Sequence, residues 1–166
     1  MNYLWSPWRM EYIEDENKDN ECVFCSAPGW SDFREHLIVY RGELTYLILN
    51  RYPYTSGHLM VVPYEHKRSL ELLDSQTRAE IMELASRAIQ VLREAYQPQG
   101  FNMGINIGAA AGAGIVEHVH LHIVPRWTGD TNFMSSLFHT RVLPETLEDT
   151  YQRVLSSWLK LEGKEK

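Results

Sequence analysis

The sequence predicts an α+β fold in which an antiparallel sheet packs against a long helix. Short apolar runs separated by turn residues recur before residue 63 and again after residue 100, as expected for strands. Between them, the apolar residues of 75–96 recur at intervals of three and four, which is the period of an amphipathic helix. A chain of 166 residues with 44% hydrophobic composition and no internal repeat suits one globular domain with a single core.

The strands are expected in five apolar runs. Arg41-Gly42-Glu43 is a plausible hairpin turn between the first two of them. The runs cover His36–Tyr40, Leu44–Leu49, His58–Val62, Asn102–Ile107 and Ile115–Val124. Together they predict an antiparallel sheet.

Two helices are expected. The first covers residues 75–96, with Asp74 or Ser75 as its cap, and the Pro98 and Gly100 region stops it because proline cannot continue the hydrogen-bond ladder. Pro144 opens the second helix, whose apolar stripe carries Leu147, Tyr151, Val154, Leu155 and Trp158. The single domain therefore divides into an N-terminal arm with an acidic loop over 1–21, a core over 22–127 and a C-terminal extension over 128–166.

The charge balance excludes some partners. A net charge of −6 and a pI near 5.6 argue against a protein that coats nucleic acid or an anionic membrane, and leave room for a local basic pocket for a small phosphate ligand. No run approaches the ~18 apolar residues of a membrane span, and the first residues lack the order of a secretory signal. We therefore expect a cytoplasmic protein that handles a nucleotide rather than a nucleic acid.

Three histidines alternate with aliphatic residues near the end of the core. In a strand, His118, His120 and His122 share one face, and the aliphatic residues after each of them share the other. A row of imidazoles is poor packing material because each ring has two polar nitrogens that need partners. The row predicts a site, and histidine can serve there as nucleophile, proton donor, phosphate-binding donor or metal ligand.

Cys22 and Cys25 are the only cysteines and form a Cys-x-x-Cys pair. In a reducing compartment such a pair indicates half of a metal site or a redox pair rather than a structural disulfide. Two reduced cysteines of the core are the third interpretation, and the redox one is weakest because no thioredoxin-like βαβ pattern surrounds the pair.

Two further segments near the histidines have open interpretations. The small residues of the loop 108–114 either admit a ligand close to the backbone or make a permissive connection. Arg126 contacts phosphate or belongs to a surface pair. The aromatic arm with Tyr3, Trp5 and Trp8 is expected to pack in a dimer or in the core rather than to form a base-stacking platform, while Trp127 and Phe133 are expected nearer the site.

The run His118–Val124 resembles the His-x-His-x-His-x-x signature of the histidine triad (HIT) nucleotide hydrolases and transferases. Residues 49–53, 56–63 and 104–108 resemble further blocks of the same family in the same order, so the resemblance covers about residues 22–127. It implies a five-stranded antiparallel sheet with a long packed helix, and a homodimer that places two nucleotide sites on one side.

The resemblance also implies catalytic roles. His120, the central histidine, would attack the α-phosphorus and carry a covalent nucleotidyl intermediate, which splits one difficult displacement into two easier ones. His122 would donate to phosphate oxygens and supply the proton of the leaving group, and His58 resembles the fourth histidine of the phosphate site.

Binding roles follow in the same way. Asn50 resembles the residue that binds ribose hydroxyls, and Asn106 resembles a polar residue that reaches the phosphates. Gly104 and Gly108 would let the backbone approach the nucleotide.

The branch of the family is indicated by three features. Asn50-Arg51-Tyr52-Pro53 is similar to the fragile-histidine-triad branch, which cleaves dinucleoside polyphosphates. The loop 112–116 lacks the glutamine and hydroxyl that often precede the triad, and this loop, with residues 4–10 and 127–134, resembles bacterial diadenosine tetraphosphate phosphorylases. We therefore expect diadenosine tetraphosphate as the substrate and inorganic phosphate as the acceptor. One alternative is a hydrolase of dinucleoside polyphosphates or nucleoside phosphoramidates. The other is a nucleotide-binding signalling module with slow, incidental catalysis.

Zinc is implied by relatives that bind it through residues matching Cys22, Cys25, His66 and His118. A closed set of two cysteines and two histidines suits structural zinc, and no organic cofactor is expected. A rival interpretation makes His118, His120 and His122 the ligands of a catalytic zinc, but the chain offers no evident carboxylate arrangement for an open site.

Overall fold

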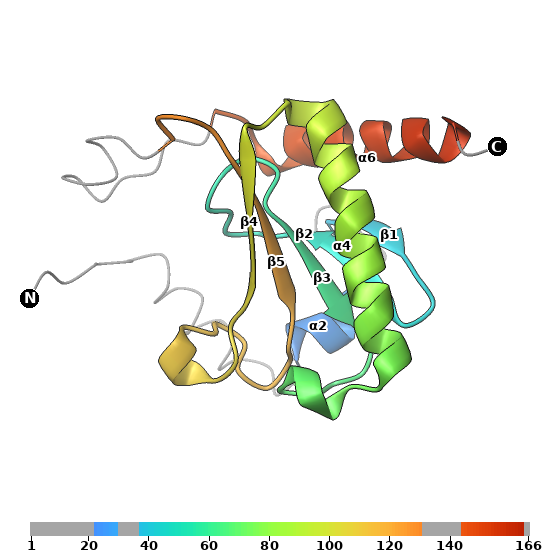
Figure 1. Ribbon diagram of the computed structural model, residues 1–166, viewed down its shortest axis with the longest axis vertical. Helices are drawn as coiled ribbons and strands as arrows, with labels where there is room; N and C mark the ends of the chain where they lie inside the picture. Colours follow the sequence, from blue (N-terminus) through green and yellow to red (C-terminus); the bar gives the residue numbers. More distant parts are fainter. Residues whose placement is uncertain (1–21, 30–36, 131–143, 165–166) are drawn as a thin grey trace, which may run out of the picture.

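The computed structural model describes residues 22–29, 37–130 and 144–164 (Figure 1). The strands are β1 (Ile38–Arg41), β2 (Thr45–Leu49), β3 (Leu59–Pro63), β4 (Gly100–Ile105) and β5 (Leu121–Arg126). The α-helices are α2 (Val23–Ser26), α4 (Ser75–Tyr96) and α6 (Leu147–Lys164), with three short 3₁₀ turns at Ala27–Gly29, Leu70–Leu72 and Ala109–Ala111. The aromatic arm and acidic loop, His36 and the segment with Phe133 lie outside the described residues.

The five strands form one antiparallel sheet, as predicted. Their order is β1-β2-β3-β5-β4, so β5 lies between β3 and β4. The hairpin turn at Gly42 is closed by its N–H, which donates to the carbonyl of Thr45 at 2.8 Å. This order brings the histidine strand into the interior of the sheet and leaves β4 at an edge.

Helix α4 has the predicted bounds, because its sequence signals agree with each other. The Asp74 carboxylate accepts from the Thr77 N–H at 2.7 Å, which satisfies one of the orphan donors of the first turn. At the other end Gln97 adopts a left-handed conformation with φ 48° and ends the helix. Its apolar stripe, Ile81, Leu84, Ala85, Ala88, Val91 and Leu92, is buried in the core.

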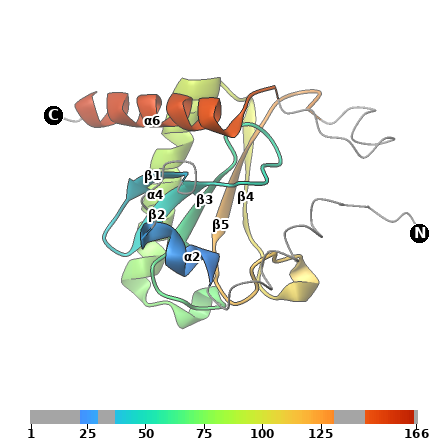
Figure 2. The same ribbon diagram turned by 180° about the vertical axis from the view of Figure 1, so that it is seen from behind.

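Helix α6 begins at Leu147, three residues later than Pro144. Its start is set by Thr146, whose hydroxyl accepts from the Asp149 N–H at 3.1 Å. The predicted stripe is confirmed, since Val154 and Trp158 are buried and Leu147, Tyr151 and Leu155 pack against the core. The helix crosses one end of α4 and contacts β1 (Figures 1 and 2).

The bounds of β1, β2 and β3 differ from the predicted ones by one or two residues, and those of β4 and β5 differ in ways that affect the site. Strand β4 covers 100–105 rather than 102–107, so Asn106 follows the strand. Strand β5 begins at Leu121 instead of Ile115, so the prediction that all three histidines lie in one regular strand is wrong. The reason is that the Val119 N–H donates at 2.7 Å to the carbonyl of Lys67, in the connection after β3, instead of to a strand.

The sheet has two different faces. Helix α4 lies across one face, and the short helix α2 lies on the opposite side (Figures 1 and 2). The aliphatic residues that alternate with the histidines, Val119, Leu121 and Ile123, are at most 5% exposed and belong to the core. The two-sided character predicted for this segment therefore holds even where it is not a regular strand. Among the described residues, no helix is long and apolar enough to cross a membrane.

Candidate functional site

Three histidine rings form a contiguous group. The ring centroids of His120 and His122 are 4.7 Å apart, and those of His58 and His122 are 5.1 Å apart. His58 comes directly before β3, and the pairing of Met60 with His122 brings β3 beside β5. His58 is fully buried and His120 is 5% exposed, so the ring nitrogens of these two residues need a partner or a ligand, while His122 is half-buried.

The contacts of His120 define its neutral form. Its Nδ1 lies 2.8 Å from the backbone carbonyl oxygen of His118, and because a carbonyl only accepts, Nδ1 carries the proton. The other nitrogen, Nε2, then holds the lone pair. Burial lowers the pKa of His120, which keeps the ring neutral near pH 7. A neutral imidazole with a free Nε2 lone pair is a competent nucleophile.

His58 and His122 carry their protons on Nε2, the opposite ring nitrogen from that of His120. The Tyr54 N–H donates to Nδ1 of His58 at 3.1 Å, so the proton of His58 lies on Nε2. That Nε2–H points to Nδ1 of His122 at 3.0 Å, which makes Nδ1 of His122 the acceptor. Burial and, secondly, His120 lower the pKa of His122 to about 4. Neutral His122 therefore carries its proton on Nε2 and presents a hydrogen-bond donor there.

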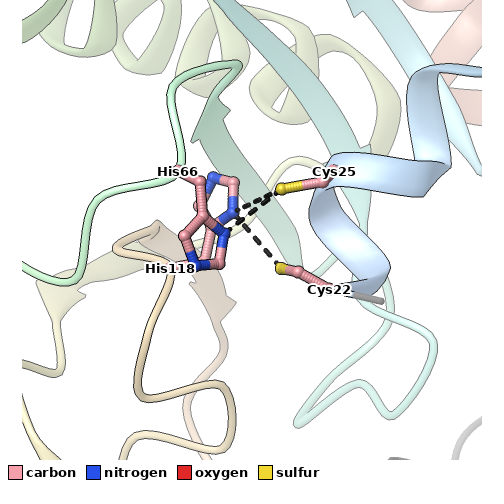
Figure 3. A group of neighbouring side chains, drawn as sticks. All are labelled: Cys22, Cys25, His66 and His118. Carbon is pink, nitrogen blue, oxygen red and sulfur yellow. Dashed lines mark hydrogen bonds between the residues drawn. The ribbon is translucent and has the colours of Figure 1, made fainter. Parts of the chain in front are cut away.

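A second cluster gathers the four residues expected as metal ligands. Cys22, Cys25, His66 and His118 each contribute one donor atom, and these atoms all lie within 4.8 Å of one another. In Figure 3 Cys25 comes from α2, Cys22 from the residue directly before it and the histidines from the connections beside it, with all four side chains pointing toward one another. Spacing alone indicated the cysteine pair, the resemblance supplied the two histidines, and the fold brings the four side chains together as predicted.

Three distances between the donor atoms are close to those of a tetrahedral metal site. Zinc bonds of about 2.0–2.3 Å hold neighbouring ligand atoms about 3.3–3.8 Å apart. The Cys25 Sγ–His66 Nδ1 distance is 3.2 Å, and Nδ1 of His118 lies 3.4 Å from Sγ of Cys22 and 3.6 Å from Sγ of Cys25. Nε2 of His118 contacts the Pro63 carbonyl at 2.9 Å, which places the proton on Nε2 and turns the lone pair of Nδ1 to the sulfurs.

Electrostatics around the cluster also favour a cation. Burial and the neighbouring Cys22 raise the pKa of the Cys25 thiol to about 11. Burial lowers the pKa of His118 to about 4, so its ring stays neutral and keeps a lone pair. Two sulfurs that repel each other as thiolates are stabilised by a divalent cation between them, which would release protons as it binds. Both cysteines are free rather than joined in a disulfide.

The expected nucleotide-binding residues lie on the connections around the histidines. Asn50 follows β2, and its side-chain oxygen accepts from the Tyr52 N–H at 2.9 Å, which fixes the orientation of the amide. Asn106 follows β4 and is half-buried. Gly104 pairs with His122 across the sheet. Gly108 has φ +82°, a conformation that favours glycine, and a Cβ there would meet open space, so its smallness serves the turn.

Arg126 is a structural residue in this conformation. Its guanidinium binds the Asp130 carboxylate through two nitrogens, at 2.6 and 2.8 Å, and donates to the side-chain oxygen of Asn102 at 2.6 Å. Of the two interpretations, the surface pair is the one observed.

Two aromatic residues near the histidines were missed by the sequence analysis. Phe24 is buried against the rings of His118 and His120, with centroids 5.4 and 4.8 Å apart. Tyr54 is 46% exposed and lies over His58 at 4.6 Å and along His122 at 6.2 Å. Their positions inside the Cys-x-x-Cys pair and four residues before His58 are the only signals the sequence offered.

Comparison with known proteins gives consistent results. A family model described as the HIT domain matches residues 34–129. The AP-4-A phosphorylase of Mycobacterium tuberculosis is 42% identical over 163 residues, which cover 93% of this chain and 83% of that protein.

Solved structures agree in fold. A Zn-bound histidine triad family protein from Mycobacterium smegmatis is 30% identical, with a TM-score of 0.71 over 87% of this chain and 98% of that one. A hypothetical histidine triad nucleotide-binding protein from Sulfolobus tokodaii strain7 is also 30% identical, with a TM-score of 0.69 over 86% of this chain and 95% of that one.

Proposed function

Since the chain belongs to the HIT family, we propose that it is a nucleotidyltransferase that cleaves diadenosine tetraphosphate, with inorganic phosphate as the acceptor. The observation that carries the proposal is the 42% identity to an AP-4-A phosphorylase over 93% of the chain. The neutral, buried His120 with its lone pair on Nε2 supplies a matching chemistry.

In the first step, Nε2 of His120 attacks the α-phosphorus and forms a phosphorus–nitrogen bond. The bond from that phosphorus to the bridging oxygen breaks, and ATP leaves. The Nε2–H of neutral His122 donates a hydrogen bond to the oxygen of the departing ATP and stabilises its charge, without proton transfer, because a neutral imidazole is too weak an acid to protonate ATP. His58 holds His122 in the required tautomer through the 3.0 Å contact.

In the second step, a phosphate oxygen attacks the same phosphorus. The phosphorus–nitrogen bond breaks, ADP is released and His120 returns to its neutral form. His122 stays neutral and donates the same hydrogen bond to the incoming phosphate, which attacks through an unprotonated oxygen and keeps its proton in the ADP formed. Diadenosine tetraphosphate and phosphate thus give ATP and ADP, with atoms balanced.

Binding of the nucleotide is assigned to the two asparagines and the glycines. The amide of Asn50, oriented by the Tyr52 N–H, donates to ribose hydroxyls. Ile105 pairs with Leu121, and continuing this register by one residue sets Asn106 opposite His120. From there the Asn106 amide reaches the phosphates. A Cβ at Gly104 or Gly108 would meet open space, so the backbone is accessible to the nucleotide at both positions.

Zinc is the ion that we assign to Cys22, Cys25, His66 and His118. The closed Cys₂His₂ donor set suits a structural ion, which would supply folding energy rather than a reactive water. This cluster draws His118 away from His120 and His122, so the rival catalytic zinc site would lose one of its three ligands.

A homodimer through β4 is part of the proposal. Strand β4 is at an edge of the sheet, and Met103 on it and Ile107 just after it are 40% and 45% exposed. An unpaired edge with apolar side chains favours pairing with a second copy. Sedimentation of Met103→Lys should show more monomer than the wild type.

Product analysis with and without phosphate tests the activity. Phosphorolysis gives ADP plus ATP and stops when phosphate is removed, whereas hydrolysis gives AMP plus ATP whether or not phosphate is added. The hydrolase alternative would be supported by the second result. Turnover well below roughly 1 s⁻¹, against a typical median near 10 s⁻¹, would instead favour a binding module.

A further inference from the structure

Phe24 joins the two side-chain clusters of the site. It lies between Cys22 and Cys25 on α2, it is 5% exposed, and its ring is buried against two histidines. The ring centroids are 4.8 Å apart for Phe24 and His120, at an interplanar angle of 58°, and 5.4 Å apart for Phe24 and His118, at 76°. One aromatic ring thus contacts the proposed nucleophile and a proposed metal ligand together.

The helix that carries Phe24 has few residues to hold it in place. It is only four residues long, which is too short to be stable by itself. Its anchors are the sulfurs of Cys22 and Cys25, which face His118 and His66, and the Phe24 carbonyl, which accepts from the buried Tyr46 hydroxyl at 2.7 Å. A metal ion bound at the sulfurs would fix both ends of this turn.

Besides its contact with His122, His120 has two contacts that lead to the cluster of Cys22, Cys25, His66 and His118. Its Nδ1–H donates to the carbonyl of His118, whose own ring is a proposed ligand. Its ring lies against Phe24, whose two flanking cysteines are the other ligands on α2. The hydrogen bond fixes the tautomer of His120, and the Phe24 ring restricts rotation of the imidazole about its side-chain bonds.

We propose that Phe24 is a positioning residue for His120, and that metal binding at Cys22 and Cys25 acts through Phe24 and His118 to aim the His120 Nε2 lone pair at the phosphorus. The inference rests on the proposed role of His120 as nucleophile. It assigns the metal a second effect besides folding. Ring placement matters because a displacement of about 1 Å in a reacting group costs about 100-fold in rate.

The first test compares zinc-loaded Phe24→Leu with the wild type in single-turnover experiments. The rate at which His120 acquires AMP from diadenosine tetraphosphate should fall about 10- to 100-fold, because leucine fills the space without a flat ring. KM should stay within about twofold, since Phe24 is buried behind the histidines. Phe24→Met serves if the leucine variant does not fold.

Tyr40→Leu is the matched control. Tyr40 is a half-buried aromatic residue on β1 that packs against Trp158, with ring centroids 4.6 Å apart, and against Arg87. Its loss should lower the melting temperature and leave the rate of AMP transfer unchanged. A Phe24→Leu rate within twofold of the wild type, or an equal fall in Tyr40→Leu, would overturn the proposal.

A second readout needs no turnover. In ¹⁵N-histidine-labelled wild type, the two ring nitrogens of His120, assigned by their absence in His120→Ala, should report one tautomer with the proton on Nδ1. Zinc removal and Phe24→Leu should each broaden or average these signals. Unchanged signals in both samples would sink the inference. If the wild type never acquires AMP at His120, the proposed function fails instead, and the nitrogen signals still decide whether Phe24 and the metal hold the ring.

Discussion

His58 and His122 contact each other nitrogen to nitrogen, with Nε2 of His58 3.0 Å from Nδ1 of His122. Because the Tyr54 N–H occupies Nδ1 of His58, the proton between the two rings belongs to His58. The Tyr54 N–H therefore fixes the tautomer of His58, and His58 in turn fixes that of His122, which carries its own proton on Nε2. This is the nitrogen that faces away from His58 and that can serve a leaving group.

Replacement of His122 should affect the rate in a way that depends on the leaving group. His122→Asn is expected to lose about 10²–10³-fold in turnover of diadenosine tetraphosphate, because the departing ATP no longer accepts a hydrogen bond from Nε2. With the 2,4-dinitrophenyl ester of AMP the loss should be far smaller, since that much less basic group needs less stabilisation as it leaves. Equal losses on both substrates would show that His122 binds phosphate without assisting the leaving group. His120→Ala, as a control, should fail with both.

The stability of the protein should fall in acid because of His122. Burial, followed by His120, lowers the pKa of His122 from 6.5 to about 4. As pH falls, His122 is protonated near pH 6.5 in the unfolded chain but only near pH 4 in the folded one. The stability that neutral His122 contributes is therefore complete above pH 6.5 and is lost as pH falls to about 4. Urea unfolding at several pH values should show the wild type losing free energy of unfolding relative to His122→Gln as pH falls from about 6.5 to about 4. Parallel curves would contradict the assignment.

Glu80 should be important for stability but not for chemistry. Its Oε1 accepts from the N–H groups of Leu44 and Thr45, at 3.0 and 2.9 Å, and from the Thr45 hydroxyl at 2.8 Å. Glu80→Ala leaves these donors without a partner and should reduce the free energy of unfolding by about 1–3 kcal/mol. Glu83→Ala, an exposed position on the same helix, is the control and should change it by less than about 0.5 kcal/mol. Turnover should be unchanged in both.

Metal removal should act mainly on stability. Cys25→Ser and His66→Ala should each abolish zinc binding, measured as zinc per chain, and lower the melting temperature. A metal at 100 times its Kd contributes about 2.7 kcal/mol to folding. Glu65→Gln, the exposed neighbour of His66, should keep the metal. Formation of the AMP adduct should persist in the zinc-free protein at a reduced rate, whereas a complete loss with intact folding would favour catalytic zinc.

The regular elements were predictable where local signals agreed. In α4 the helical period, the Asp74 cap and the stop near Pro98 all point to the same bounds. The start of β5 was not predictable, because the alternating residues 115–120 satisfy a strand pattern and the deciding contact, from Val119 to Lys67, is distant in sequence. Alternation of polar and apolar residues predicts which side chains share a face better than it predicts where strand pairing begins.

The site was predictable in its residue types and less so in its geometry. The resemblance supplied His66 and His118 as partners of the cysteine pair, and the fold brings these four side chains together. The protonated nitrogen of each histidine and the contact between Phe24 and His120 depend on backbone groups of other segments, which no local pattern encodes.

Capture of the covalent intermediate tests the central claim most directly. The protein is mixed with diadenosine tetraphosphate without phosphate, quenched within one turnover at neutral or alkaline pH and measured by intact and peptide mass spectrometry. We expect one AMP per chain on His120, which disappears as ADP when phosphate is added. Absence of any adduct, together with wild-type turnover in His120→Ala, would contradict the account.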